Sequence, residues 1–143
     1  MAYIKHRRLS LSPINYNIHG RAKKFLMHKT IEKMTRPIHG EDVCGVGVDG
    51  ETRCQHYHGE LDIIAIKFKC CGRWFPCFEC HAAAADHEPQ IWPADKRDEL
   101  AILCGVCGLR LSINEYFACD STCPECESKF NPGCANHYHL YFA

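Results

Sequence analysis

Residues 54–87 read CQHYHGELDIIAIKFKCCGRWFPCFECHAAAADH. The segment is dense in side chains that bind metal: Cys54, His56, Cys70, Cys71, Cys77, Cys80, His81 and His87. Zn²⁺ is a borderline-soft ion that fills a tetrahedral shell with thiolate sulfur and imidazole nitrogen. Eight such ligands predict two closed zinc sites.

The spacing of these ligands predicts how they divide between the two ions. Cys77-x-x-Cys80 places two thiolates on one turn, and Cys54-x-His56 is a shorter chelate. Adjacent residues in an extended segment point to opposite sides, so vicinal ligands favour two ions over one. The preferred grouping is Cys54, His56, Cys77 and Cys80 around one ion and Cys70, Cys71, His81 and His87 around the other.

A second ligand pattern follows downstream. Cys104, Cys107, Cys123 and Cys126 form CxxC-x15-CxxC, a spacing typical of zinc ribbons. Gly108 permits the positive φ that a metal knuckle often needs. Four thiolates leave no open position, and zinc is favoured over iron. The twelve ligands together predict three bound Zn²⁺ ions.

Composition supports metal binding over disulfides. The 143 residues include 12 Cys and 10 His, and a secreted disulfide framework has no use for the histidines. Thiolates that bind zinc must stay reduced, which predicts a cytoplasmic location, with the mitochondrial intermembrane space as the alternative. No apolar run is long enough for a transmembrane helix, and the first forty residues lack the apolar core of a secretory signal, so we expect no membrane insertion.

Charge is distributed unevenly along the chain. Residues 1–36 carry nine Lys/Arg and one Glu, whereas residues 37–143 carry eight Lys/Arg and sixteen Asp/Glu. We interpret residues 1–36 as a disordered basic leader, with a mitochondrial targeting segment and a nucleic-acid or lipid contact as alternatives. Nucleic-acid binding would rest on this leader alone, because the remainder is acidic and repels phosphate.

Local patterns predict the secondary structure between the ligands. Residues 61–69 alternate β-branched residues and predict a strand, and the alanine run after His81 predicts a short helix that holds His81 and His87. Pro93 predicts the start of a helix through Ala101. Ser112 and Glu115 form a capping box for a helix over 113–117. The aromatic C-terminal run resembles a strand.

These elements predict a small, metal-stabilised α+β fold. Residues 37–92 are expected to form an irregular β-rich unit with two zincs, and residues 93–143 a zinc-ribbon-like unit with one zinc. Each structural zinc contributes on the order of 10–16 kcal/mol of binding free energy to folding, more than the net stability of a small domain. The chain is expected to be a monomer.

Other readings of the ligands carry less weight. His58-x-Glu60 followed by Pro76-Cys77-x-x-Cys80 matches the zinc deaminase signature, but a short β-rich segment separates the two halves. Cys134, His137 and His139 lack an obvious fourth ligand, so we expect them to pack or hydrogen-bond beneath the ribbon. Cys44 is expected to be a small buried hydrophobe, and neither it nor Cys119 has an assigned redox role.

The ligand pattern resembles the CHY-type zinc finger family. The resemblance is carried by Cys54-x-His56-Tyr57, the vicinal Cys70-Cys71, Cys77-x-x-Cys80-His81 and His87, and it extends over about residues 40–142. The closing segment, residues 130–142, is similar to the short stand-alone branch of the family, which has bacterial members and a fungal mitochondrial member. The resemblance implies zinc binding through the same twelve positions. For the fungal member it implies help in assembling small Tim chaperones in the mitochondrial intermembrane space.

These observations predict a non-enzymatic zinc-binding protein. It would dock an unidentified protein partner, or exchange zinc or thiols with one as an assembly helper. The alternative is a thiol oxidoreductase or a zinc-dependent hydrolase or deaminase. A hydrolase needs a three-ligand zinc with bound water, and a redox enzyme needs an accessible cysteine of low pKa.

Overall fold

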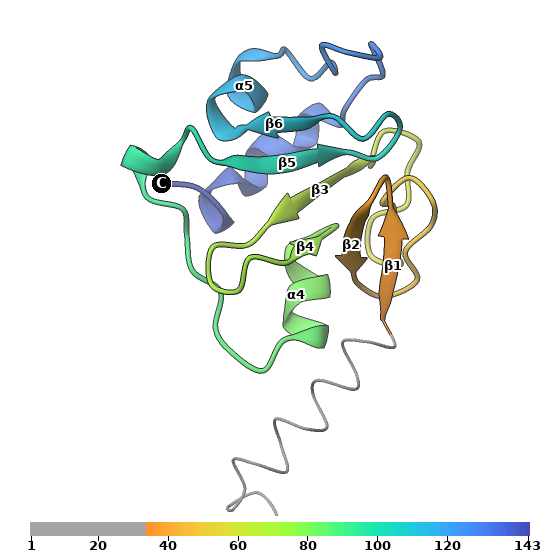
Figure 1. The fold of residues 1–143 in the computed structure, drawn as a ribbon, viewed down its shortest axis with the longest axis vertical. Coiled ribbons are helices and arrows are strands. Elements are labelled where there is room, and N and C mark those ends of the chain that lie inside the picture. Colours follow the sequence, from red (N-terminus) through yellow and green to blue (C-terminus); the bar gives the residue numbers. More distant parts are fainter. Residues whose placement is uncertain (1–33) are drawn as a thin grey trace, which may run out of the picture.

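The computed structural model describes residues 34–143, which form one sheet with helical segments around it (Figure 1). The predicted basic leader lies outside the described residues, apart from its last three. The strands are β1 (Thr35–Ile38), β2 (Glu41–Cys44), β3 (Ile64–Lys67), β4 (Trp74–Phe75), β5 (Leu100–Cys104) and β6 (Arg110–Ser112). Their order in the sheet is β1-β2-β4-β3-β5-β6.

Pairing in the sheet joins distant parts of the chain. β2 and β4 run parallel, with Val43 opposite Trp74, and the other neighbours are antiparallel. β3 pairs with β5 so that Ile64 lies opposite Cys104. The sheet is therefore continuous across residues 92 and 93, where the sequence predicts a boundary between two units. The division into units stays a prediction.

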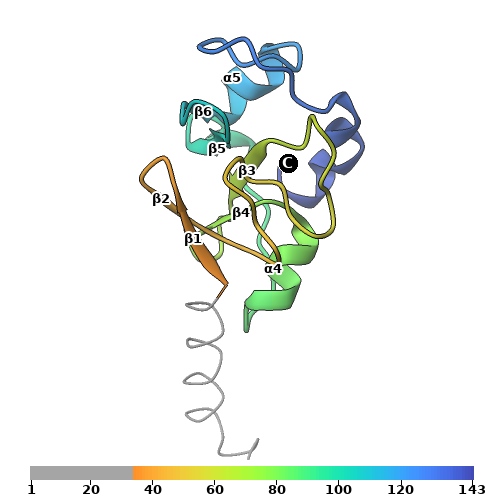
Figure 2. The same ribbon diagram turned by 90° about the vertical axis from the view of Figure 1, so that its right-hand side faces the viewer.

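Apolar side chains cover both faces of the sheet, because successive residues of a strand point to opposite faces and here both sets are apolar. Ile64, Ile66 and Ile102 belong to the larger buried cluster. Ala65 and Leu103, which alternate with them, belong to a smaller cluster with Val43, Trp74 and Ile38. In the view of Figure 2, helix α4 and the C-terminal segment η2 lie on one side of strands β3 and β4, and the β1–β2 hairpin of the same sheet lies on the other.

Two α-helices begin at side-chain caps. Helix α4 (Phe78–Ala84) starts after Cys77, whose sulfur accepts the backbone N–H of Cys80. Helix α5 (Ile113–Ala118) has the predicted capping box, with Ser112 and Glu115 each bonded to the other's backbone N–H. Helix α4 starts earlier than predicted and holds Cys80 and His81, whereas His87 lies beyond its end. The prediction of one helix holding His81 and His87 is therefore wrong.

Two further local predictions are wrong. The helix expected from Pro93 to Ala101 is a single 3₁₀ turn, η1 (Ala94–Lys96), followed by strand β5, because pairing with β3 and β6 overrides local helix propensity. The C-terminal run expected to be strand-like is the 3₁₀ segment η2 (Pro132–Leu140), which begins where the Asn131 side chain accepts the Gly133 N–H. Across residues 34–143 no helix combines the length and hydrophobicity that crossing a bilayer requires.

Candidate metal centres

Each of the twelve ligands predicted from the sequence lies in one of three groups of four. The ligand atoms within each group all lie within 4.8 Å of one another. The first tetrad is Cys54, His56, Cys77 and Cys80; the second is Cys70, Cys71, His81 and His87; the third is Cys104, Cys107, Cys123 and Cys126. These are the groups that the sequence spacing favours. The small α+β fold with three Cys/His groups is confirmed.

The spacing of the atoms fits zinc. With Zn–S of about 2.3 Å, the sulfur atoms of a tetrahedral site lie about 3.8 Å apart, and a sulfur and an imidazole nitrogen about 3.6 Å apart. The Cys54 and Cys77 sulfurs are 3.7 Å apart, and His56 Nδ1 lies 3.5 Å from the sulfurs of both Cys77 and Cys80. The three tetrads therefore fit three zinc ions.

The first tetrad joins the loop after β2 to the start of α4. Its three cysteines are almost fully buried, and Cys80 has no exposed surface. Backbone N–H groups point at the sulfurs: Tyr57 N lies 3.4 Å from Cys54 Sγ, Cys80 N 3.3 Å from Cys77 Sγ, and Val46 N 3.4 Å from Cys80 Sγ. Such donors stabilise thiolates and fix their positions.

The three thiols of the first tetrad are coupled to one another. Hydrogen bonds from Cys77 and Cys80 lower the pKa of the Cys54 thiol. The pKa values of Cys77 and Cys80 are instead raised, chiefly by their hydrogen bonds to the Cys54 sulfur. One thiolate thus forms at the expense of the other two. Three thiolates at this separation are stable together only with a dication between them.

The second tetrad lies closer to solvent. The sulfurs of Cys70 and Cys71 are 3.8 Å apart, and His81 Nε2 lies 3.2 Å from Cys70 Sγ. Both cysteines lie in the turn after β3, where adjacent side chains need not point to opposite sides as they do in a strand. Of the four ligands only His81 is buried, and the side chain of His87 is 34% exposed.

Neighbouring side chains orient the two histidines of the second tetrad. Phe68 stacks on His81, and burial followed by the neighbouring His87 lowers the pKa of His81 to about 4, so its ring stays neutral. A neutral imidazole is the form that binds zinc. His87 Nδ1 lies 3.1 Å from Asp86 Oδ1, which leaves Nε2 for the metal. The sequence analysis missed Phe68 and Asp86 as supporting residues, although an acid directly before His87 was a readable signal.

The third tetrad joins the turn between β5 and β6 to the loop after α5. Cys104 Sγ lies 3.8 Å from Cys126 Sγ, and Cys107 Sγ lies 3.7 Å from Cys123 Sγ. Gly108 has a φ of 85°, as the predicted knuckle requires. A hydrogen bond to the Ser128 hydroxyl lowers the pKa of Cys126 to about 7, towards the thiolate that zinc binds. Ser128 was also missed by the sequence analysis.

Residues outside the tetrads also have defined places. His58, which a deaminase site would need, belongs to none of the metal-binding groups in residues 34–143, and neither do Cys134, His137 and His139. Cys44 is 1% exposed, as expected for a small buried hydrophobe, and burial raises the pKa of its thiol. The first tetrad brings together four candidate ligands, whereas a deaminase zinc has three protein ligands and an open position.

Comparison with known proteins agrees with this geometry. The family described as CHY zinc finger matches residues 54–138. Helper of Tim protein 13 from Saccharomyces cerevisiae is 44% identical over 103 residues, which are 70% of this chain and 89% of that protein. The protein of the same name from Kluyveromyces lactis is 44% identical over 101 residues, with 70% and 87% covered. An uncharacterized protein from Schizosaccharomyces pombe is 37% identical over 101 residues, with 71% and 88% covered.

The two Helper of Tim relatives are matched over most of their length. The family match includes all twelve residues of the three tetrads. Its Cys and His positions are the ones that the fold brings together around three zinc-sized sites. The chain belongs to the CHY zinc finger family.

Proposed function

We propose that this chain is a non-enzymatic zinc protein that helps Tim proteins to assemble, and that it does so by exchanging zinc at the tetrad of Cys70, Cys71, His81 and His87. Two relatives with the printed name Helper of Tim protein 13 support the assembly role. In this proposal the twelve tetrad residues are the zinc ligands, and the partner is a protein.

The observation that carries the exchange proposal is the contrast between the tetrads. All three cysteines of the first tetrad are buried, and the third tetrad has two fully buried cysteines, Cys104 and Cys123. In the second tetrad three ligands reach the surface. An incoming thiolate from a partner must approach the metal before a resident ligand leaves, and this tetrad presents the most ligands to solvent, including His87, the one exposed ligand among the three tetrads of the described residues.

His87 is the ligand suited to leave first. It lies in the segment after α4, is the most exposed ligand of its tetrad, and is held by Asp86 at the surface. A neutral imidazole leaves zinc without carrying a negative charge away, whereas a departing thiolate must be protonated or solvated. We therefore place His87 at the start of the exchange.

We further propose that the chain works in the mitochondrial intermembrane space, the compartment that the resemblance implies for the fungal branch. The relatives give no support to the cytoplasmic location that composition alone predicts.

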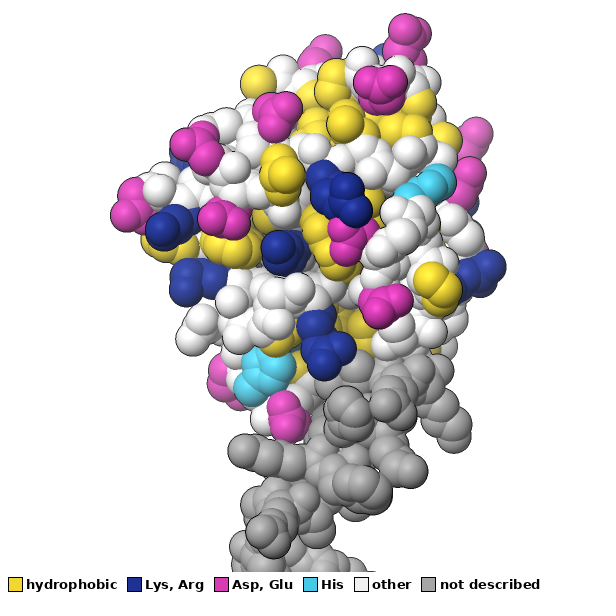
Figure 3. Space-filling view, in the orientation of Figure 1, with side chains coloured by type: hydrophobic (Ala, Val, Ile, Leu, Met, Phe, Trp, Pro, Cys, Tyr) yellow, Lys and Arg dark blue, Asp and Glu magenta, His cyan; other side chains and the backbone are white. Residues whose placement is uncertain are grey.

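On the face shown in Figure 3, acidic and basic side chains are interspersed, with no continuous basic strip of the kind that binds nucleic acid.

Native mass spectrometry of the zinc-loaded chain during titration with EDTA tests the exchange proposal. We expect three zincs at the start and a two-zinc species that accumulates first. The His87→Ala variant should begin with two zincs or lose one at far lower EDTA. The His139→Ala variant removes an exposed histidine outside the tetrads and should behave like the parent. Loss of all three zincs in one step would contradict exchange at one tetrad.

A complementation experiment tests the assembly role separately. In Saccharomyces cerevisiae lacking its own Helper of Tim protein 13, expression of this chain should restore Tim assembly measured by native electrophoresis. The His87→Ala variant should restore less than the His139→Ala variant at equal protein abundance. Failure of the parent chain would reject the assembly role, whatever the EDTA titration shows.

A further inference from the structure

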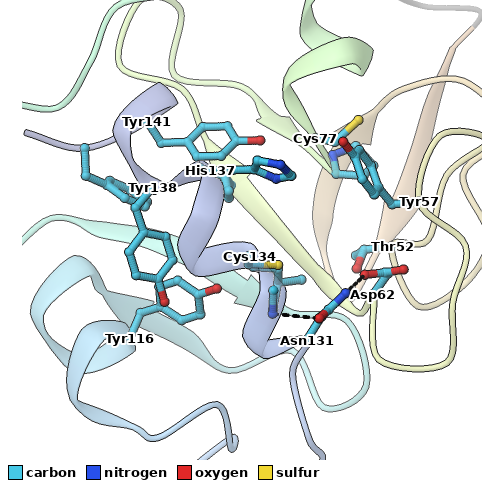
Figure 4. A pocket seen from close by; sticks show the side chains of 15 residues that line it. Thr52, Tyr57, Asp62, Cys77, Tyr116, Asn131, Cys134, His137, Tyr138 and Tyr141 are labelled. Atoms are coloured by element: carbon cyan, nitrogen blue, oxygen red, sulfur yellow. Dashed lines mark hydrogen bonds between the residues drawn. The ribbon is translucent and has the colours of Figure 1, made fainter.

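A cavity of about 140 Å³ lies between the sheet and segment η2 (Figure 4). Most of its walls are apolar or aromatic, and these come from three parts of the chain: Ile64, Ile66, Tyr116, Tyr138, Tyr141 and Phe142. Tyr116, Tyr141 and both isoleucines are buried, whereas Tyr138 is partly exposed. The cavity is thus a pre-formed hollow with largely aromatic walls, one of which, Tyr138 of η2, reaches solvent.

Asp62 and Asn131, two of the polar residues that line the cavity, already have hydrogen-bond partners. Asn131 donates from Nδ2 to Asp62 Oδ1 at 2.9 Å, and Gly59 N donates to Asp62 Oδ2 at 2.8 Å. Asn131 Oδ1 accepts the N–H of Gly133 at 2.8 Å. Figure 4 shows the two Asn131 bonds beside the hollow. No lysine or arginine lines the cavity, and its one carboxylate is occupied on both oxygens, so the site favours an uncharged occupant.

We propose that this cavity binds one phenylalanine-sized aromatic side chain of the protein partner. The volume matches that requirement, since an apolar cavity of about 150 Å³ takes up benzene. Aromatic walls favour an aromatic occupant further, because edge-to-face ring contacts add to the gain from burial. The proposal rests on the proposed function only in taking the partner to be a protein.

Two consecutive ring contacts connect the cavity to the second tetrad. Tyr141 lines the cavity and packs edge-on against Phe68, with centroids 5.6 Å apart. Phe68 in turn stacks on His81. Cys77 of the first tetrad also lines the cavity. A partner anchored here by one side chain therefore lies beside the zinc centres with the rest of its chain free to reach them.

NMR titration of the zinc-loaded full chain tests the proposal with three blocked peptides. The probes are Ac-Gly-Phe-Gly-NH2 and its Ala and Lys counterparts. We expect saturable millimolar binding of the Phe peptide, with shifts at Ile66, Tyr116 and Tyr138 and direct contacts from its ring to those side chains. The Ala peptide should bind at least tenfold more weakly. Absence of Phe binding, or stronger binding of the Lys peptide, would overturn the proposal.

A filled cavity provides the matched control. Cys134 lines the cavity without belonging to a tetrad, so Cys134→Phe should occupy the space and abolish Phe-peptide binding. His139→Phe places the same ring on an exposed position of η2 and should leave binding intact. Zinc content of three in both variants shows that they fold. Equal peptide binding by the two would overturn the site while leaving the EDTA result untouched.

Discussion

The imidazole of His81 lies flat on the ring of Phe68, with centroids 4.3 Å apart and planes inclined by 7°. Phe68 is 3% exposed and also packs against Phe75 and Tyr141. The stack fixes the direction in which His81 Nε2 points, towards Cys70 Sγ at 3.2 Å. A residue that binds no metal thus sets the geometry of the second tetrad.

Replacing Phe68 with Leu should weaken zinc binding at the second tetrad about 10- to 100-fold, as for other residues that orient metal ligands. The substitution keeps most of the buried volume but lets the imidazole turn. Competition with a chromophoric chelator measures the loss. Phe130→Leu is the control, because Phe130 is 1% exposed and packs on Tyr116, away from the second tetrad. Equal zinc loss in both variants would show a general packing effect instead.

Zinc should decide which cysteines react with an alkylating reagent. Nine of the 12 cysteines lie in tetrads, leaving Cys44, Cys119 and Cys134. In the zinc-loaded chain we expect labelling of Cys119 and Cys134, with Cys44 protected by burial, and the other nine should react only after EDTA. Peptide mass spectrometry after iodoacetamide treatment gives the pattern. Early labelling of Cys54, Cys77 or Cys80 would count against a closed first tetrad.

The pH dependence of that labelling carries a separate expectation for Cys134. Burial raises the pKa of its thiol above 9.0, and Asp62 adds to the effect. Since the thiolate is the reactive form, its fraction keeps growing until the pH passes this raised pKa. The alkylation rate of Cys134 should therefore level off at a higher pH than that of free cysteine. A plateau at lower pH than free cysteine would show that the thiol is activated.

Replacing Gly105 with Ala should lower the free energy of unfolding by at least about 2 kcal/mol. Gly105 follows β5 and packs against the loop that contains Glu51 and Thr52, where an added carbon has no room. It would lie 2.2 Å from the Glu51 carbonyl oxygen. Gly40→Ala is the control: its φ of 84° imposes strain, but nothing lies within 4 Å of the new carbon. Denaturant unfolding of both zinc-loaded variants measures the difference. A cost for Gly105→Ala no larger than for Gly40→Ala would reject the steric argument.

Replacing Cys126 with Ser should remove one zinc and leave two. Cys126 is partly exposed and lies in a knuckle outside the sheet, whereas Cys104 lies in β5 opposite Ile64. Cys104→Ser should therefore also weaken the β3–β5 pairing and lower the unfolding free energy of the whole sheet. Native mass spectrometry and thermal unfolding separate the two effects. Loss of all zinc from Cys126→Ser would instead indicate one cooperative metal cluster.

Local chemistry made part of this structure predictable. Short chelates such as Cys77-x-x-Cys80 restrict which ligands can share an ion, and Ser112 with Glu115 satisfies a helix start within four residues. Both kinds of signal act between neighbours in sequence. The candidate ligands and the position of α5 could be read from the sequence for that reason, whereas the sharing of one site by Cys54, His56, Cys77 and Cys80 depends on the fold.

Long-range pairing explains what could not be predicted. Residues from Pro93 to Ala101 have helix-favouring chemistry, but Leu100 and Ala101 enter β5 because β3 and β6 offer partners on both sides. Strand β4 has only two residues, too few for any periodic signal. The Phe68–His81 stack likewise joins residues 13 positions apart through a turn, and no spacing rule reports it.

The parallel pairing of β2 with β4 has a consequence for how the chain can be observed. The connection between these strands carries Cys54 and His56, so a metal bound there would fix a crossover that in parallel sheets is usually a helix. Trp74 lies at that pairing, 5% exposed, with Nε1 donating to Glu41. Release of zinc from the first tetrad should free the β1–β2 hairpin and move this indole into water. In a Trp92→Phe variant, which leaves Trp74 as the single tryptophan, its fluorescence then reports zinc occupancy of the first tetrad in real time.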